Sequence, residues 1–157
     1  MKLALPYQIQ LQAPFGMLGI HCEAGALTGI GFLASGCIVS PPRDAFAKEV
    51  CAQLTAYFDD ANFQFDLPLN LSGTEHQLKV WRALRDIPCG QVQTYGELAA
   101  ALHSSPRAVG QACGNNPLPI VIPCHRVVSK AGMGGFMHRV DSGALNIKHW
   151  LLTHERH

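Results

Sequence analysis

The sequence predicts a small α/β unit followed by a mostly helical domain that contains a helix-turn-helix. Short apolar segments separated by turn residues fill the first part of the chain, whereas residues that open and close helices recur in the second part. The charge follows the same division. Residues 1–71 carry three Lys/Arg and six Asp/Glu, and residues 72–157 carry nine and five. A chain of 157 residues has room for two small domains, and we expect their boundary between residues 71 and 72.

The N-terminal unit begins with segments typical of β-strands. Loosely alternating apolar residues predict strands over 7–13 and 17–33. The turn sequences Pro14-Phe15-Gly16 and Glu23-Ala24-Gly25 interrupt them, because glycine and proline favour chain reversal. These features predict a small antiparallel sheet.

A helical pattern follows the predicted sheet. It opens at Pro41-Pro42 and runs to about Phe58, and its apolar face contains Phe46, Val50, Leu54 and Tyr57. Strands followed by a helix are typical of a small α/β unit. Residues 62–72 then have the character of a linker.

Three helix starts are legible in the C-terminal half. Thr74 with Gln77, and Thr94 with Glu97, have the spacing of capping boxes. Ser105 is a suitable N-cap for a third helix that starts with Pro106 and ends at Gly114. The second and third helices are short and closely spaced, which indicates a helix-turn-helix.

The spacing of the cysteines and the absence of long apolar segments argue against a secreted, membrane-spanning or zinc-binding protein. The six cysteines lie at 22, 37, 51, 89, 113 and 124, and none forms a Cys-x-x-Cys pair. We expect unbridged thiols in a reducing, cytoplasmic compartment, and we expect no signal peptide and no membrane span. His21, Cys22 and Cys37 are the one set of candidate zinc ligands, but their spacing matches no standard pattern, so we predict no metal.

The segment 117–128 contains the candidate nucleophile. Its prolines exclude a regular helix, its apolar residues indicate burial, and it ends in Cys124-His125-Arg126. A reactive thiol needs neighbours that stabilise its thiolate, which two basic residues can supply. A Cys-His pair alone is more often structural, so this motif does not decide between a core thiol and a catalytic one.

The helix predicted after Ser105 has an unusual composition. Residues 107–112 read Arg-Ala-Val-Gly-Gln-Ala, with small side chains where a major-groove reader carries long polar ones. The small residues fit either close packing against another helix or close approach to DNA, with Arg107 as the one long side chain at the start.

Together these segments resemble the O6-alkylguanine-DNA alkyltransferase family. The similarity rests on Pro123-Cys124-His125-Arg126-Val127-Val128 after Asn116-Pro117, on Thr94-Tyr95-Gly96-Glu97-Leu98-Ala99 and on Arg107-Ala108-Val109-Gly110. It continues into the last helix with Lys148, Trp150-Leu151-Leu152 and Glu155. The resemblance implies a ribonuclease H-like N-terminal unit, a winged-helix-like C-terminal domain, and repair of double-stranded DNA by a cytoplasmic, nucleoid-associated monomer without a cofactor.

The resemblance also implies a role for each catalytic residue. Cys124 would accept the alkyl group of O6-alkylguanine once and irreversibly, with O4-alkylthymine as an open second substrate. His125 would keep Cys124 a thiolate through a water molecule, and Glu155 would orient His125. Asn116 would brace the turn, and Tyr95 would donate a proton to the departing guanine.

DNA contacts and a base pocket follow from the same resemblance. Arg107 would enter through the minor groove and replace the flipped base, and the implied DNA-binding residues are Arg107, Ala108, Gly110, Gln111, Tyr95 and Thr94. The implied pocket consists of Pro119, Val127, Met133, Gly134, Gly135 and Phe136. One departure lies here: Phe136 stands where the family has tyrosine, and residues 137–142 make the loop longer by about four residues.

Three other functions compete with alkyl transfer. An alkyltransferase-like protein would bind the lesion without reacting, but it would lack a nucleophile at position 124. A regulator that senses alkylation would need a second DNA-reading domain, and none is evident. A thiol hydrolase would need an oxyanion hole, for which the sequence offers no candidate.

Overall fold

The computed structural model describes residues 9–33, 42 and 44–156, and the chain divides between Asn70 and Leu71 into two units. Each unit has its own buried apolar residues. No helix in the described ranges is long and apolar enough to cross a membrane.

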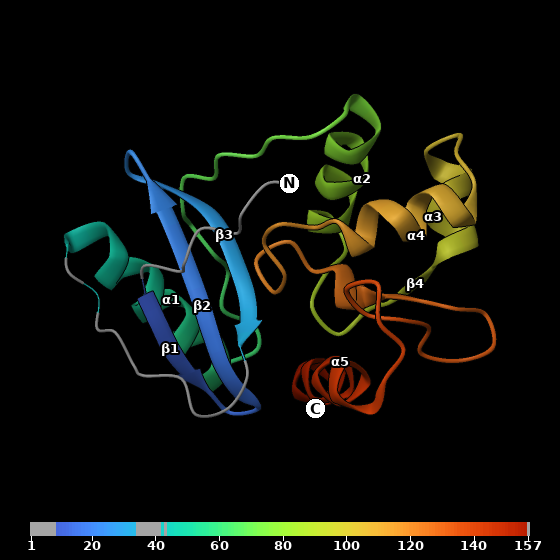
Figure 1. Cartoon of the computed structure of the whole chain (residues 1–157). Coiled ribbons are helices and arrows are strands. Elements are labelled where there is room, and N and C mark those ends of the chain that lie inside the picture. The colour runs from blue at the N-terminus through green and yellow to red at the C-terminus, as the bar shows by residue number, and fades with distance from the viewer. Residues whose placement is uncertain (1–8, 34–41, 43, 157) are drawn as a thin grey trace. The chain divides into compact units, whose positions relative to one another are not determined.

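An antiparallel sheet forms the first unit together with one helix (Figure 1). The strands β1 (Ile9–Ala13), β2 (Gly16–Glu23) and β3 (Ala26–Leu33) pair in the order β1-β2-β3. Ala24 and Gly25 join β2 to β3 with φ of 51° and 74°, the left-handed pair that matches the twist of a tight hairpin. The predicted small antiparallel sheet is confirmed over the described residues, while residues 7 and 8 of the first predicted strand lie outside them.

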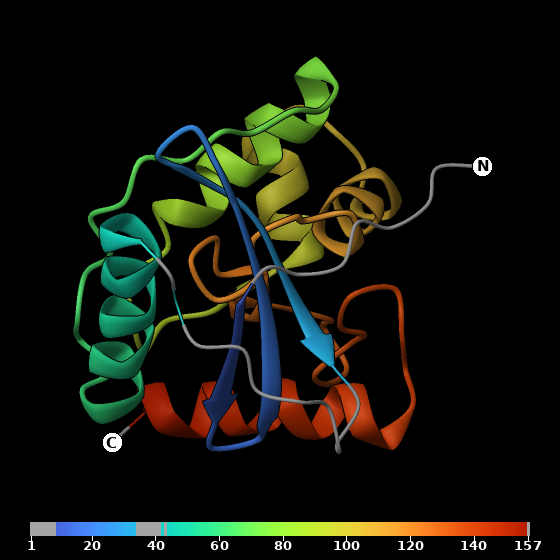
Figure 2. The ribbon, with the colours of Figure 1, turned by 60° about the vertical axis from the view of Figure 1, so that its left-hand side comes forward.

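Helix α1 (Ala45–Asp59) packs on one face of this sheet (Figures 1 and 2). It begins at Ala45 and not at Pro42, because the Asp44 side chain accepts a hydrogen bond from Ala47 N at 2.7 Å and caps the helix there. Pro41 lies outside the described residues. Most of the predicted apolar face is buried, namely Val50, Leu54 and Tyr57, whereas Phe46 is only half-buried.

Part of the segment predicted as a linker pairs with the sheet. Leu27 N of β3 donates to Pro68 O at 2.8 Å, and Asn70 N donates to Leu27 O at 3.0 Å. Leu69 thus forms a parallel bridge with Leu27. The linker interpretation was wrong for these residues, because their backbone groups extend the edge of the sheet beside β3.

The second unit is mostly helical. Its elements are α2 (Glu75–Arg85), β4 (Gln93–Thr94), α3 (Tyr95–Ala101), α4 (Pro106–Gly114), the 3₁₀ turn η1 (Cys124–Arg126), β5 (Val127–Val128) and α5 (Ser142–Glu155). Both predicted capping boxes are present, and Ser105 caps α4 ahead of Pro106. These caps supply partners for backbone N–H groups that a helix start leaves unbonded, which is why the sequence predicted them.

Two contacts bring the segments of the second unit together around η1. The short strands β4 and β5 pair in parallel, Gln93 with Val127 and Thr94 with Val128, so the start of α3 lies beside the end of η1. The Trp81 indole N–H donates to Ala112 O at 2.8 Å and joins α2 to α4. Residues from three distant parts of the chain therefore meet near Cys124.

Candidate active site

Cys124 begins the turn η1, and the preceding residues hold this turn in place. Asn116 Nδ2 donates to Ile122 O at 2.8 Å, and Asn116 Oδ1 accepts from Leu118 N at 2.9 Å. Ile120, which lies between Leu118 and Ile122, has a φ of 77°, and this angle is unfavourable for a β-branched residue. The buried Asn116 amide thus stabilises a strained loop whose end is the cysteine.

The Cys124 thiol is buried, with 4% of the residue exposed. Burial raises its pKa to about 11, although a hydrogen bond from Asn116 and the positive charge of Lys148 act in the opposite direction. At neutral pH the resting side chain is consequently a thiol. A nucleophilic role requires a base that removes its proton.

His125, Arg126 and Glu155 form a buried network behind this cysteine. His125 Nε2 lies 2.8 Å from Glu155 Oε2. The guanidinium of Arg126 donates to both oxygens of the same carboxylate, from Nε at 2.9 Å and from Nη2 at 3.0 Å, and from Nη1 to Ile87 O. A bidentate Arg–carboxylate pair has fixed geometry, so Glu155 is positioned independently of the histidine.

His125 is neutral in this network. Burial lowers its pKa, and although Glu155 favours the charged form, Arg126 and Lys148 disfavour it. The Nε2–H group of a neutral imidazole donates to Glu155, which leaves Nδ1 as an acceptor. That Nδ1 atom is buried and accepts no hydrogen bond from the described residues.

Lys148 of α5 supplies a buried cation. Its ammonium donates to Val127 O and to Gly135 O, each at 2.8 Å, and lies 5.9 Å from the centre of the Tyr95 ring. Burial lowers its pKa to about 8. The group joins the loop after η1 to α5 and places positive charge near the thiol.

Tyr95 lies at the start of α3 with glycines on both sides. A Cβ atom at Gly134 would be 3.0 Å from the Tyr95 ring, and one at Gly110 would be 4.0 Å away. Burial raises the Tyr95 pKa to about 12, so its hydroxyl retains the proton over the neutral range. The space beside the ring thus excludes a side chain more strictly at Gly134 than at Gly110, where a Cβ atom would make an ordinary van der Waals contact.

A cavity of about 470 Å³ opens onto Cys124. The predicted site residues that line it are Tyr95, Arg107, Gly110, Cys124, Gly135 and Phe136. The remaining lining comes from both ends of α4 and from the loop before α5, namely Pro106, Cys113, Gly114, Met137, His138, Arg139 and Val140. Arg107 itself is exposed at the start of α4.

The other predicted site residues lie outside the cavity wall. Asn116, His125 and Glu155 form the layer behind the thiol, and Pro119 and Val127 are buried in the core. Gly134 packs on Tyr95 as described. The remaining predicted residues that do not line the cavity are Thr94, Ala108, Gln111 and Met133.

Three residues near the thiol were not predicted as site residues. Arg126 holds the carboxylate, Lys148 provides the buried cation, and Met137 Sδ lies 3.9 Å from Cys124 Sγ. The sequence contained a signal for the first two, because a charged residue in an apolar segment needs a partner when buried. No signal identified Met137, since no local rule predicts the path of the loop in which it lies.

No cluster of metal-binding side chains occurs in the described ranges. No three of the His, Cys, Asp and Glu residues there are placed to hold an ion. Of the zinc ligands considered from the sequence, His21 Nδ1 pairs with Thr28 Oγ1 at 2.7 Å, and Cys37 lies outside the described residues.

Comparison with known proteins assigns the chain to a family. Residues 75–157 match the family model "6-O-methylguanine DNA methyltransferase, DNA binding domain". A methylated-DNA–protein-cysteine methyltransferase of Mycolicibacterium paratuberculosis is 45% identical over 156 residues, which are 93% of this chain and 90% of the relative. The chain belongs to this family. The resemblance seen in the sequence is therefore confirmed.

Solved structures of the family have the same fold. The O6-methylguanine methyltransferase of Mycobacterium tuberculosis is 34% identical with a TM-score of 0.80, over 97% of this chain and 93% of its own. A structure of the M. tuberculosis enzyme OGT in complex with DNA is 36% identical with a TM-score of 0.76, over 94% and 91% of the two chains. A methyltransferase of this family thus binds DNA with a chain of closely similar fold.

Proposed function

We propose that this protein repairs DNA by transferring an alkyl group from the O6 atom of guanine directly to Sγ of Cys124, once per molecule. The observation that carries the proposal is the neutral His125, which is held by Glu155, has an unpaired buried Nδ1 and directly follows the buried Cys124 in the chain. A base held by a third group is the general arrangement that activates a nucleophile.

The proton of Cys124 has a defined route in this mechanism. A water molecule between Sγ and His125 Nδ1 relays the proton to the imidazole, and Glu155 stabilises the resulting cation. The thiolate attacks the alkyl carbon, the carbon–sulfur bond forms, and the carbon–oxygen bond to guanine breaks. Tyr95 donates its proton to the departing base and regains one from solvent. The thioether is stable, so no turnover follows and no cofactor is needed.

Base flipping is required because the thiol is buried. A sulfur with so little exposure cannot reach an atom within stacked base pairs, so the alkylated nucleotide must rotate into the 470 Å³ cavity. Helices α3 and α4 act as the helix-turn-helix of a winged-helix-like domain, with α4 in the minor groove. Arg107 fills the space that the flipped base leaves in the duplex. Thr94, Ala108 and Gln111 contact the sugar-phosphate backbone of the DNA.

The remaining parts of the proposal concern the cell and the assembly. The N-terminal unit, residues 1–71, is a ribonuclease H-like domain, and residues 72–157 carry both DNA binding and the acceptor. The protein acts as a cytoplasmic monomer on the nucleoid.

Intact mass before and after incubation with a duplex containing O6-methylguanine tests the proposal. We expect the mass to increase by a single methyl group, which peptide mapping places on Cys124. Cys124→Ser should abolish the increase, whereas Cys113→Ser, which removes the other buried thiol of the cavity, should retain it. Methyl on Cys113, or tight binding of the duplex without any mass change, would refute alkyl transfer to Cys124; the second result would indicate a lesion-binding protein.

A further inference from the structure

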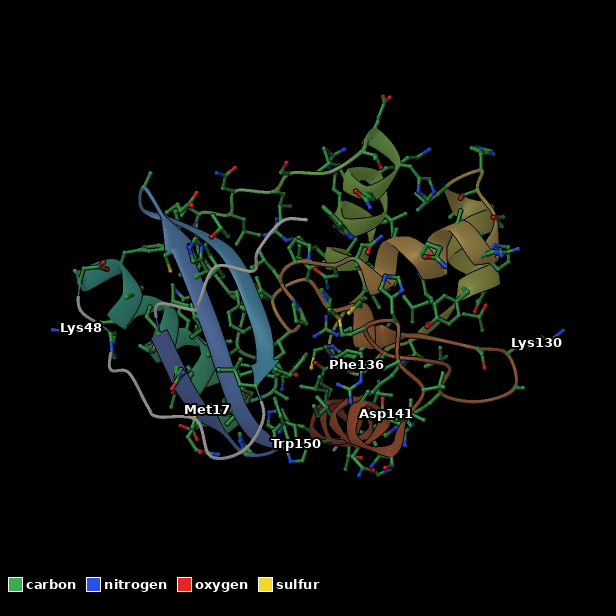
Figure 3. The ribbon with its side chains drawn as sticks, viewed as in Figure 1. Met17, Lys48, Lys130, Phe136, Asp141 and Trp150 are labelled. Carbon is green, nitrogen blue, oxygen red and sulfur yellow. The ribbon has the colours of Figure 1, made fainter. Side chains whose placement is uncertain are left out.

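The loop after η1 contains a tight turn that lies beside the acceptor thiol. Phe136 N donates to Arg139 O at 2.8 Å, and Arg139 N donates to Phe136 O at 2.9 Å, so Met137 and His138 form the tip of a two-residue turn. Figure 3 shows Phe136 on this loop, which leads to Asp141 and the start of α5. The tip of the turn falls within residues 137–142, which the sequence resemblance indicates as additional loop length.

The backbone of this turn is unfavourable for the residues that occupy it. Met137 has a φ of 53° and His138 a φ of 63°, and turns of this kind normally use glycine or asparagine. Neither residue is glycine, so contacts of the two side chains must offset the strain. Their contacts therefore indicate what the turn is for.

The two side chains of the tip point to different parts of the cavity. Met137 Sδ lies 3.9 Å from Cys124 Sγ, whereas His138 Nε2 lies 2.9 Å from Asn115 Oδ1. The His138 ring covers Gly114 so closely that a Cβ atom there would collide with it. His138 thus anchors the turn to the end of α4, and Met137 is left over the thiol.

The base of the turn is anchored as firmly as its tip. Phe136 is buried, with 4% exposed, and the Lys148 ammonium binds Gly135 O. Arg139 pairs with both oxygens of Asp141, the residue that caps α5. Within this hydrogen-bonded turn the Met137 side chain has three rotatable bonds, so it can change its rotamer without moving the backbone.

We propose that Met137 is the residue that determines which alkyl groups this protein accepts, an inference that rests on the proposed function. The alkyl carbon must reach Sγ of Cys124 from the cavity, and the Met137 thioether already lies against that sulfur. A methyl group fits beside a thioether that moves slightly. A larger group, such as benzyl, requires the Met137 side chain to leave the thiol altogether, and the strain-bearing turn limits where it can go.

The positive φ angles supply a matched pair of variants. Met137→Gly removes the side chain over the thiol, and His138→Gly removes the side chain over Gly114, while glycine tolerates the turn in both. Met137→Leu keeps comparable bulk without sulfur. Single-turnover rates with duplexes bearing O6-methylguanine or O6-benzylguanine give the benzyl-to-methyl ratio for each protein, and circular dichroism confirms that each is folded.

We expect Met137→Gly to raise the benzyl-to-methyl ratio roughly tenfold or more, the scale of one apolar contact in a binding pocket. Met137→Leu should keep the ratio of the original protein, whereas His138→Gly, which keeps the Met137 side chain but releases the contact of the turn with the end of α4, should raise the ratio less than Met137→Gly does. An unchanged ratio in Met137→Gly, or an equal rise in His138→Gly, would overturn the inference.

Thiol labelling separates this inference from the proposed function. A small uncharged disulfide, 4,4′-dithiodipyridine, should label Cys124 faster in Met137→Gly than in the original protein, with no DNA present. If no protein accepted an alkyl group, the proposed function would fail. Faster labelling would then still support Met137 as the cover of the thiol, and equal labelling rates would overturn it.

Discussion

Replacing Glu155 by glutamine changes the charge of the buried network while keeping its shape. Three N–H donors converge on two carboxylate oxygens, one from His125 and two from Arg126. A glutamine side chain offers one oxygen and one NH₂ group, so at least one of these donors must face another donor. Either the pairing with Arg126 is lost, or His125 adopts the tautomer that carries its proton on Nδ1.

The first outcome lowers the stability of the fold, and the second lowers the rate of alkyl transfer. In the wrong tautomer, Nδ1 is a donor and cannot accept the Cys124 proton, which removes general-base assistance worth about 10²–10⁴ in rate. If the Arg126 pairing is lost instead, a guanidinium with only 12% of its side chain exposed faces a neutral amide. Breaking a buried ion pair destabilises a protein by about 3–5 kcal/mol, and we expect the lower end because Arg126 keeps its bond to Ile87 O.

The assay is the single-turnover rate on an O6-methylguanine duplex together with unfolding in urea. Glu97→Gln is the matched control, because Glu97 is an exposed capping-box residue and glutamine serves equally well at that position. We expect Glu97→Gln to retain rate and stability. A Glu155→Gln protein that kept the original stability and a rate within threefold of the original, a difference of less than about 1 kcal/mol in the activation barrier, would refute the assigned role of Glu155.

Three further predictions concern the DNA contact, the pocket and the pH profile. Arg107→Ala should lower repair in duplex much more than reaction with free O6-benzylguanine, and equal losses would remove its role in the flipped state. Phe136→Tyr should change the O6-methylguanine rate by roughly threefold to twelvefold if the hydroxyl reaches O6, the effect of one hydrogen bond; a slower reaction would show that the hydroxyl is stranded in the core. Because burial lowers the His125 pKa, the acid limb of the rate profile should have its midpoint below 6.5, and a midpoint above 6.5 would contradict a neutral resting histidine. The same shift makes the unfolded state take up the proton first, so the His125 contribution to stability is complete above pH 6.5 and decreases as the pH falls below it.

Local rules predicted the helix starts of the second unit well. Thr74, Thr94 and Ser105 cap their helices because a hydroxyl three residues before a free N–H is a local arrangement that needs no tertiary contact. The same rule applies to Asp44, which caps α1 and places its start at Ala45, three residues after Pro42. The pairing of Leu69 with Leu27 was not predictable in this way, because it joins residues far apart in the chain.

The same distinction between local and long-range contacts applies to the active site. The nucleophile and its neighbours lie in one short motif, so the sequence pointed to Cys124 and His125 directly. The partners of that motif come from elsewhere: Glu155 and Lys148 lie in the last helix, and Met137 lies in the loop before α5. Resemblance to the family pointed to Glu155, whereas the position of Met137 depends on a turn whose two positive φ angles contradict the local preference of its residues.

The adjacency of His125 and Arg126 has a physical purpose that the motif alone does not reveal. An isolated buried carboxylate would favour the imidazolium form of His125, because an opposite charge raises the pKa of a histidine. Arg126 satisfies the charge of Glu155 with two hydrogen bonds, and this leaves the carboxylate to orient the imidazole without protonating it. His125 is then neutral before the reaction and stabilised as a cation after it takes the thiol proton. The two basic residues after the cysteine therefore have different tasks: Arg126 pairs with the Glu155 carboxylate, and His125, whose pKa is lowered mainly by burial, stays neutral until it accepts the thiol proton.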